Sequence, residues 1–381
     1  MNDYIDFGLV AVAFIIAFFF EWQILPKILL ISRKRHLYDL PNSRKTHIYA
    51  TPRLAGVSFM PIVLFSSLFS LFIYAKTYSY FEPFFSSNID LSKLSVLQNF
   101  LQELCMLICG MLLLLLVGVK DDLIGVRFRI KFEVQIIAAL CLTLSGVYFK
   151  HTYGILLVNE LPMYLGIPFS IFVIVLVTNA VNLIDGIDGL ASGLCIIATG
   201  AFGISFFLHG FIPHSVLSFA CMGLLIPFFY YNVFKRQERK LFMGDTGSLT
   251  LGFILSYLTI RHSMVTSDFP NCVSHILLPW SVLFIPAFDV ARVMLHRKIR
   301  HQPMFKPDRN HLHHKLLDVG LSHRRAMVSI VSASALLLCF NMIIGVFINI
   351  NFIIILDFLI AISFNKWLSK KIRKKEKENL N

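Results

Sequence analysis

Charged residues are scarce in this chain, because only 15% of its 381 residues are Asp, Glu, Lys or Arg. Hydrophobic residues make up 56%, and 37 of them are phenylalanines. Such a composition leaves too little polar surface for a soluble globular protein and is typical of a polytopic membrane protein. The low charge content therefore excludes the soluble class.

Paired cysteine motifs are also absent. The chain has seven cysteines but no Cys-x-x-Cys, and all except Cys272 fall in apolar runs. This pattern excludes a disulfide framework and a thiolate metal site, and we interpret the cysteines as small apolar packing residues. No internal repeat or cleavable signal sequence is evident either, so we expect residues 1–381 to form a single membrane domain with a retained first helix.

Long apolar runs dominate what is present. A membrane-spanning helix needs roughly 20 apolar residues, and the runs predict an all-α polytopic integral membrane protein with about eleven transmembrane helices. Ten is the alternative count, because the eighth run is short and the last two are separated by a tight turn. The predicted spans are 6–28, 54–75, 98–119, 132–149, 165–181, 190–209, 213–232, 247–260, 273–294, 327–348 and 351–367.

Basic residues are concentrated in alternate loops. Under the eleven-span interpretation, one set of loops and the C-terminal tail hold 29 of the 35 lysines and arginines. Cytoplasmic loops are enriched in these residues, which predicts an N-terminus outside and a C-terminus in the cytoplasm. The net charge of +13 then reflects topology and attraction to anionic lipid, with no nucleic-acid partner. The predicted cytoplasmic segments are 31–53, 118–131, 182–190, 233–248, 296–326 and the basic tail 368–381.

A polar segment interrupts the apolar pattern between the fifth and sixth spans. Asn182, Asp185 and Asp188 are spaced three apart, with Gly186 and Gly189 between and after them. Carboxylates at a membrane face indicate a functional site, and glycine lets a ligand approach the main chain closely. The alternative interpretation is a turn rich in Asn and Asp that caps the next helix.

Two adjacent carboxylates follow the third span. Asp121 and Asp122 are flanked by Lys120 and, further along, by Lys131. Magnesium is held by one or two carboxylates while substrate phosphates complete its shell. The loop therefore predicts a magnesium site, although a charged turn without chemistry is the alternative.

Two further loops offer polar groups to the same face. In the first loop, Arg44, Lys45 and His47 could bind phosphate oxygens, or could simply be a basic cytoplasmic loop. After the seventh span, Asn232 is followed by Asp245, which stands between two glycines. Asp245 is either an additional oxygen ligand or a helix N-cap.

Three histidines lie within four residues in the last long loop. His311, His313 and His314 stand beside Arg309 and Lys315. The basic surroundings favour contacts to a pyrophosphate over a zinc site, which would need a further ligand. A solvated helix face is the third interpretation.

Taken in order, these motifs resemble those of the polyprenyl-phosphate N-acetylhexosamine-1-phosphate transferases. Within that family they are most similar to the bacterial undecaprenyl-phosphate N-acetylglucosaminyl-1-phosphate transferases that start O-antigen, capsule and wall teichoic acid synthesis. One departure is Gly56-Val57, where the family usually has Gly-Gly. The matching motifs are Lys120-Asp121-Asp122, Asn182-Leu-Ile-Asp185-Gly-Ile-Asp188-Gly-Leu, Phe242-Met-Gly-Asp245-Thr-Gly-Ser and Pro307-Asp-Arg-Asn-His-Leu-His-His.

The resemblance implies a bacterial inner-membrane enzyme that transfers a sugar-1-phosphate from a UDP-N-acetylhexosamine to undecaprenyl phosphate and releases UMP. It implies Mg²⁺, for which Mn²⁺ could substitute, and it allows a homodimer. The implied metal ligands are Asp121, Asp122, Asn182 and Asp245. The implied catalytic residues are Asp121, Asp122, Lys131, His311, His313 and His314. The implied substrate-binding residues are Arg44, Lys45, His47, Lys120, Asn182, Asp185, Asp188, Asn232 and Arg309.

Several alternatives stay open at this level. An ion-coupled membrane transporter also places carboxylates near broken helices, and a membrane zinc hydrolase would use the histidines. For a transferase, we expect direct attack by the lipid phosphate, because it is largely a dianion at neutral pH. A two-step route through Asp121 or Asp122 as nucleophile is the alternative. The identity of the sugar is open, with N-acetylglucosamine the default.

Overall fold

A computed structural model describes residues 2–39, 51–81, 91–155, 158–265, 274–301 and 310–378. In these ranges the chain forms twelve α-helices, one antiparallel pair of two-residue strands and short 3₁₀ turns. The helices are α1 (Asn2–Lys34), α2 (Phe59–Phe81), α3 (Leu91–Ile124), α4 (Phe128–Leu144), α5 (Met163–Ile184), α6 (Leu190–Leu208), α7 (Ile212–Val233), α8 (Gly244–Ser263), α9 (Ser274–Ile299), α10 (Leu312–Val319), α11 (His323–Ile344) and α12 (Ile350–Glu378). The other elements include β1 (Tyr38–Asp39), β2 (Thr51–Pro52), η1 (Leu54–Ser58) and η4 (Gln237–Arg239).

The prediction of an all-α polytopic membrane protein is confirmed. Each predicted span falls on one long helix, and the eight-residue α10 is additional. In the described ranges nine helices are long and apolar enough to cross a membrane, and among the long helices α4 and α8 fall short. Several boundaries differ from the prediction: α3 begins at Leu91 rather than 98, α4 ends at Leu144 rather than 149, and α12 continues through the basic tail as far as Glu378.

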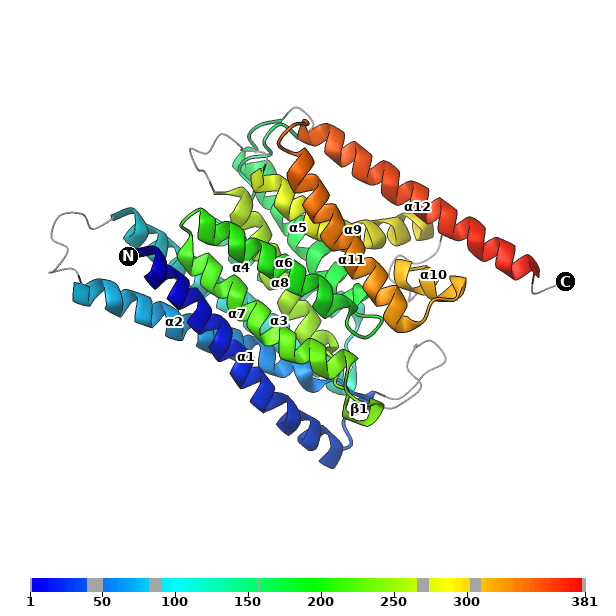
Figure 1. Ribbon diagram of the computed structural model, residues 1–381, viewed down its shortest axis with the longest axis horizontal. Coiled ribbons are helices and arrows are strands. Elements are labelled where there is room, and N and C mark those ends of the chain that lie inside the picture. The colour runs from blue at the N-terminus through cyan, green and yellow to red at the C-terminus, as the bar shows by residue number, and fades with distance from the viewer. Residues whose placement is uncertain are drawn as a thin grey trace.

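Helix α8 lies at the centre of the bundle (Figure 1). Seventeen of its twenty residues are buried, and it packs against α3 and α5. Four of its hydroxyl groups donate to carbonyls three or four residues earlier, as Ser256 Oγ does to Gly252 O at 2.7 Å. A helix can therefore be buried on all sides and still carry polar residues, because such bonds satisfy most of the hydroxyl groups. Its polar first turn is thereby fixed at one end of the bundle.

Small residues allow the helices around α8 to approach closely. A side chain on Gly118 in α3 would overlap the backbone of Thr246, and one on Gly252 would overlap the backbone of Thr178 in α5. Small residues are the usual means by which membrane helices pack at short range. These contacts bring the ends of α3 and α5 to the beginning of α8.

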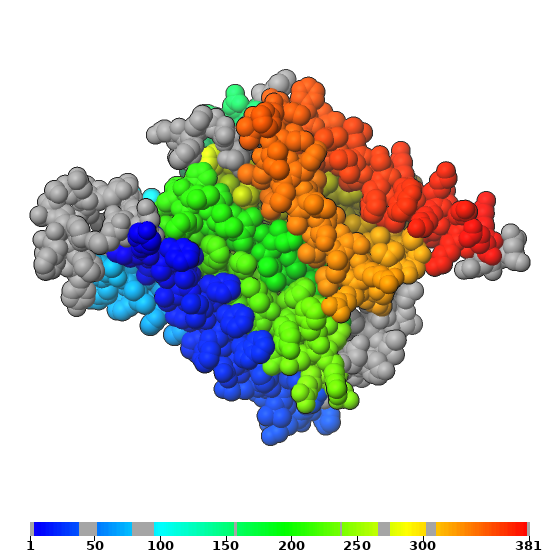
Figure 2. All heavy atoms as spheres, viewed as in Figure 1, coloured from blue at the N-terminus to red at the C-terminus, as the bar shows by residue number. Residues whose placement is uncertain are grey.

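The periphery of the bundle is strongly apolar. Helix α1 lies on one flank and α12 on the opposite one (Figure 2). In the apolar 18-residue stretch of each helix, only 22% of α11 and 17% of α12 is buried inside the protein. Large side chains such as Phe347 and Phe352 are 82% and 69% exposed. Apolar exposure on this scale is expected for surfaces that face lipid rather than water.

Candidate active site

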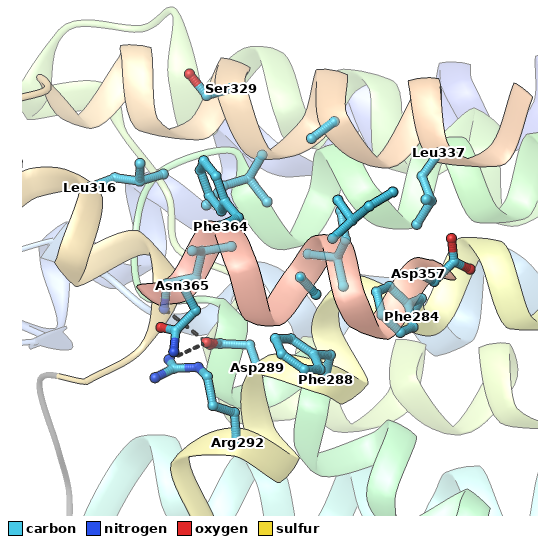
Figure 3. A pocket seen from close by; sticks show the side chains of 16 residues that line it. Phe284, Phe288, Asp289, Arg292, Leu316, Ser329, Leu337, Asp357, Phe364 and Asn365 are labelled. Atoms are coloured by element: carbon cyan, nitrogen blue, oxygen red, sulfur yellow. Dashed lines mark hydrogen bonds and ion pairs between the residues drawn. The ribbon is translucent and has the colours of Figure 1, made fainter. Parts of the chain in front are cut away.

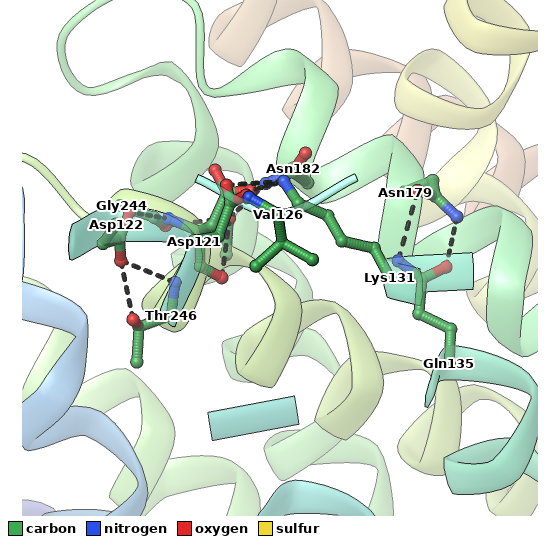
Figure 4. A network of polar contacts seen from close by, with 11 residues as sticks. Asp121, Asp122, Val126, Lys131, Gln135, Asn179, Asn182, Gly244 and Thr246 are labelled. Atoms are coloured by element: carbon green, nitrogen blue, oxygen red, sulfur yellow. Dashed lines mark hydrogen bonds and ion pairs between the residues drawn. The ribbon is translucent and has the colours of Figure 1, made fainter. Parts of the chain in front are cut away.

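A lysine links the ends of three helices at the polar end of the bundle. Lys131, near the start of α4, places its Nζ 2.6 Å from Oδ2 of Asp121 at the end of α3. The same Nζ pairs with Oδ2 of Asp245 in the first turn of α8 (Figure 4). Although burial opposes its charge, these two carboxylates raise the pKa of Lys131. The lysine is therefore a fixed positive charge between two acidic groups from distant parts of the sequence.

Asp122 has a different environment from its neighbour Asp121. Its Oδ1 accepts the backbone N–H of Asp245 at 2.8 Å, and its Oδ2 accepts the N–H and the hydroxyl of Thr246 at 3.0 and 2.6 Å. The residue at the N-cap of α8, Met243, makes no side-chain cap. Asp122 thus caps α8 from another helix, since N–H groups in a first helical turn lack partners within the helix.

The polar segment after α5 lies next to this cluster. Asn182 donates from Nδ2 to Ser248 Oγ in α8 at 2.8 Å. Asp185 follows the last residue of α5. Burial, together with the carboxylates of Asp188 and Asp245, raises the pKa of Asp185 to about 7. The three acidic motifs predicted from the sequence therefore lie close enough to affect each other's ionisation.

The turn that follows Asp185 is held in shape by Asn232 at the end of α7. Its Oδ1 accepts the N–H of Gly189 at 2.5 Å, and its Nδ2 donates to Leu241 O at 2.9 Å. Gly189 has a φ of +79°, which favours glycine. Lys240 pairs with Oδ2 of Asp188. Asn232 and Lys240 thus shape the segment that carries Asp185 and Asp188.

His313, in α10, faces this turn. A side chain on Gly186 would overlap the imidazole of His313. His313 is only 2% exposed, and neither ring nitrogen has a hydrogen-bond partner among the described residues. Burial, reinforced by His314 and His311, lowers the pKa of His313 to about 3, so the ring is neutral. An orphaned, buried imidazole beside three acidic motifs indicates a site that a ligand completes.

His311 has a partner that the sequence did not indicate. Its Nδ1 lies 2.8 Å from Oδ2 of Asp289 in α9. The other oxygen of Asp289 accepts the N–H of Leu312 at 2.9 Å and an N–H of Arg292 at 2.7 Å. The Asp-x-x-Arg spacing indicates the pair between Asp289 and Arg292 on one helix, but not the contact with His311.

The remaining predicted residues include His314, whose ring centroid lies 4.2 Å from that of His313. Lys120 is exposed at the end of α3. The segment around Gly56 packs on α8, because Gly56 N–H donates to Met243 O at 3.1 Å and a side chain there would overlap Gly247. Four other predicted residues lie outside the described residues: Arg44, Lys45, His47 and Arg309.

Comparison with known proteins bears directly on this cluster. Residues 104–263, which include α4 to α8 and most of α3, match the model of glycosyl transferase family 4. Over this segment the chain is similar to glycosyl transferase family 4. The family 4 match contains Asp121, Asp122, Lys131, Asp185 and Asp245. This similarity favours the transferase over the transporter and zinc hydrolase alternatives.

Several curated proteins resemble the chain over most of its length. A probable undecaprenyl-phosphate N-acetylglucosaminyl 1-phosphate transferase of Bacillus subtilis (strain 168) is 28% identical over 324 residues, which cover 84% of this chain and 81% of the relative. An undecaprenyl-phosphate alpha-N-acetylglucosaminyl 1-phosphate transferase of Yersinia pestis is 29% identical, covering 81% and 76%. A decaprenyl-phosphate N-acetylglucosaminephosphotransferase of Mycobacterium leprae is 28% identical, covering 76% and 72%.

Proposed function

We propose that this protein transfers N-acetylglucosamine-1-phosphate from UDP-N-acetylglucosamine to undecaprenyl phosphate, releasing UMP and starting synthesis of a surface polysaccharide. The names of the three relatives support the lipid acceptor and the sugar. The basic loops support a cytoplasmic location for the site and an inner-membrane location for the protein. Both substrates are anions, so the chemical problem is to bring two negative charges together.

The observation that carries the proposal is the position of Lys131 between Asp121 and Asp245. A positive charge that two carboxylates hold in place is preorganised to stabilise the charge of phosphate oxygens. The orphaned imidazole of His313 lies across the same region, against the turn at Gly186. We assign this region to the pyrophosphate of the UDP-sugar.

The oxygen donors of the cluster fit a magnesium ion. Among the described residues no three His, Cys, Asp or Glu side chains converge tightly enough to form a complete metal cage. Magnesium does not require one, because it keeps waters and substrate phosphate oxygens in its shell and uses one or two carboxylates. Asp121 and Asp245, which already share one cation, would hold it, with Asn182 and Asp122 adjacent. When bound, Mg²⁺ supplies neutralisation of phosphate charge.

We infer direct attack by the acceptor phosphate on the phosphorus that carries the sugar. The second pKa of a phosphate monoester is about 6, so the acceptor is already a nucleophilic dianion. Asp122 is a poor nucleophile because both its oxygens cap α8. Asp121 is held by Lys131 and by the N–H of Val126 at 2.6 Å. The role of these residues is then to position and neutralise phosphates, the main requirement in phosphoryl transfer.

The test is UMP release by the purified protein in detergent. The protein receives undecaprenyl phosphate, Mg²⁺ and one UDP-sugar at a time from a panel of UDP-N-acetylhexosamines, with Asp245→Ala run in parallel. The proposal predicts release that is fastest with UDP-N-acetylglucosamine, needs both lipid and Mg²⁺, and disappears in the variant. Release with another sugar alone would correct the donor, and no release from a folded, lipid-supplied sample would contradict the transferase.

A further inference from the structure

Asp289 is an acidic residue of α9 that none of the sequence motifs contains. It is 3% exposed and lies with Arg292 at one end of a largely apolar cavity among α9, α10, α11 and α12, whose lining also includes Ser329, Asp357 and Asn365 (Figure 3). A carboxylate in such surroundings is stable only if its oxygens are fully partnered. Asp289 meets this condition through Arg292, the N–H of Leu312 and the imidazole of His311.

These bonds fix one end of α10. Helix α10 has eight residues and no side-chain cap of its own, because its N-cap residue is His311. A helix this short is not stable in isolation. Asp289 supplies the missing cap by accepting the N–H of Leu312, and Arg292 donates to the backbone carbonyl of Asn310. The N-terminal end of α10 is therefore held by α9, while Lys315 donates from the middle of α10 to Asn365 and Ser369 of α12.

The same carboxylate defines how the His311 ring is presented. A hydrogen bond from Nδ1–H to Oδ2 selects the form of the ring protonated on Nδ1 and leaves Nε2 for a ligand. The rings of His311 and His313 are parallel within 8°, with centroids 5.8 Å apart. His311 therefore adjoins the imidazole that faces the Gly186 turn.

We propose that Asp289 is a positioning residue for the transfer reaction: it holds His311 by Nδ1 so that Nε2 meets the substrate phosphates, and it places His313 against the Gly186 turn. The role in catalysis rests on the proposed function. A purely structural ion pair between Asp289 and Arg292 would stabilise α9 but would not act through His311. The two roles predict different effects of an Asp289 substitution on activity in a protein that already lacks the His311 imidazole.

A double-mutant cycle separates them. The full-length variants Asp289→Asn, His311→Gln and the double variant are compared by UMP release, with Asp318→Asn, at the exposed end of α10, as a matched control. We expect Asp289→Asn to lower kcat about 10- to 100-fold and to leave the KM for the nucleotide nearly unchanged. The double variant should match His311→Gln within about twofold, because the two residues act as a unit. The proposal is overturned if Asp289→Asn lowers kcat by the same factor in the wild-type protein and in His311→Gln. It is also overturned if neither single variant lowers kcat.

Nuclear magnetic resonance tests the pair in the wild-type protein itself, and a variant serves only to assign the signals. The protein is labelled with ¹⁵N-histidine, and the His311 signals are those missing from His311→Gln. We expect Nδ1 of His311 to carry a proton, and a ring protonated on Nε2 alone overturns the proposal. This measurement does not depend on activity. If the wild-type protein releases no UMP with any sugar, the proposed function is contradicted, while the contact between Asp289 and His311 is still tested.

Discussion

The Nζ atom of Lys131, near the start of α4, lies 2.6 Å from Oδ2 of Asp121, at the end of α3. The two side chains are 19% and 14% exposed, so water screens the pair only partly. The same ammonium group also contacts Asp245 in α8. Lys131 therefore compensates two carboxylates that would otherwise repel each other, and the proposed chemistry depends on that arrangement.

Replacing Lys131 by methionine should have opposite effects on catalysis and on cation binding. We expect kcat to fall about 100-fold or more, as when a preorganised charge is removed from a transfer site. The Mg²⁺ concentration for half-maximal activity should decrease, because two uncompensated carboxylates attract a cation more strongly. UMP release over a Mg²⁺ titration measures both, with Lys374→Met as control, because the Lys374 side chain in α12 is 79% exposed. An unchanged or higher Mg²⁺ requirement would count against a shared position for the lysine and the metal.

Gly186 is predicted to accept no side chain. In Gly186→Ala the new methyl group would overlap the buried His313 ring and push it away from the turn. Because that ring has little room to move, we expect a loss of activity of about tenfold or more. Gly8→Ala is the matched control, since nothing lies within 4 Å of a side chain at Gly8. Full activity in Gly186→Ala would show that the contact with His313 does not matter.

Asp185 should make the stability of the ligand-free protein depend on pH. Its pKa is raised from 3.8 to about 7, so the folded protein keeps a proton that the unfolded chain has lost between these values. The contribution of Asp185 to the free energy of unfolding is therefore complete below pH 3.8 and is lost as the pH rises through about 7. The loss is at most about 4 kcal/mol.

The neutral variant Asp185→Asn lacks this loss. Its thermal unfolding temperature, measured in detergent without Mg²⁺ or nucleotide, should fall less than that of the wild type between pH about 5 and about 8. Parallel curves for the two proteins would mean that Asp185 is not protonated in the folded state.

Direct attack predicts that UMP is formed only when the acceptor is present. A rapid-quench experiment with UDP-N-acetylglucosamine and Mg²⁺, but without lipid, should yield no stoichiometric burst of UMP. A covalent phospho-enzyme on Asp121 would instead give one UMP per enzyme molecule. A burst that disappears in Asp121→Asn would replace the one-step route by the two-step route.

The helices and the acidic motifs were predictable because local pattern determines them. Apolar runs broken by polar turns predict α1 to α9, α11 and α12, since backbone groups in a bilayer must be satisfied within helices. The convergence of Asp121, Asp185 and Asp245 followed from their common membrane face. The extension of α12 to Glu378 was missed because the lysine-rich tail has no apolar period, although lysine itself favours helix.

The different contacts of the acidic residues within the site were not predictable. Asp121 and Asp122 are adjacent in sequence, yet one pairs with Lys131 and the other caps α8. Successive residues on a helix point in directions about 100° apart, and only the packing of α3 on α8 decides which group each one meets. The Asp289–His311 pair joins two helices across a long loop, so spacing could not reveal it. The roles of Asn232, Asp188 and Lys120 in substrate binding stay predictions.

The most direct test of the account follows the phosphorus that carries the sugar. The purified protein is incubated with Mg²⁺, undecaprenyl phosphate and UDP-N-acetylglucosamine labelled with ³²P in the phosphate next to the sugar, and the products are divided between organic and aqueous phases. The account predicts that the label enters the lipid phase together with the sugar, while the UMP released is unlabelled and Asp245→Ala transfers none. Label that stays in the aqueous phase while the sugar moves, or that moves without the sugar, would contradict sugar-1-phosphate transfer.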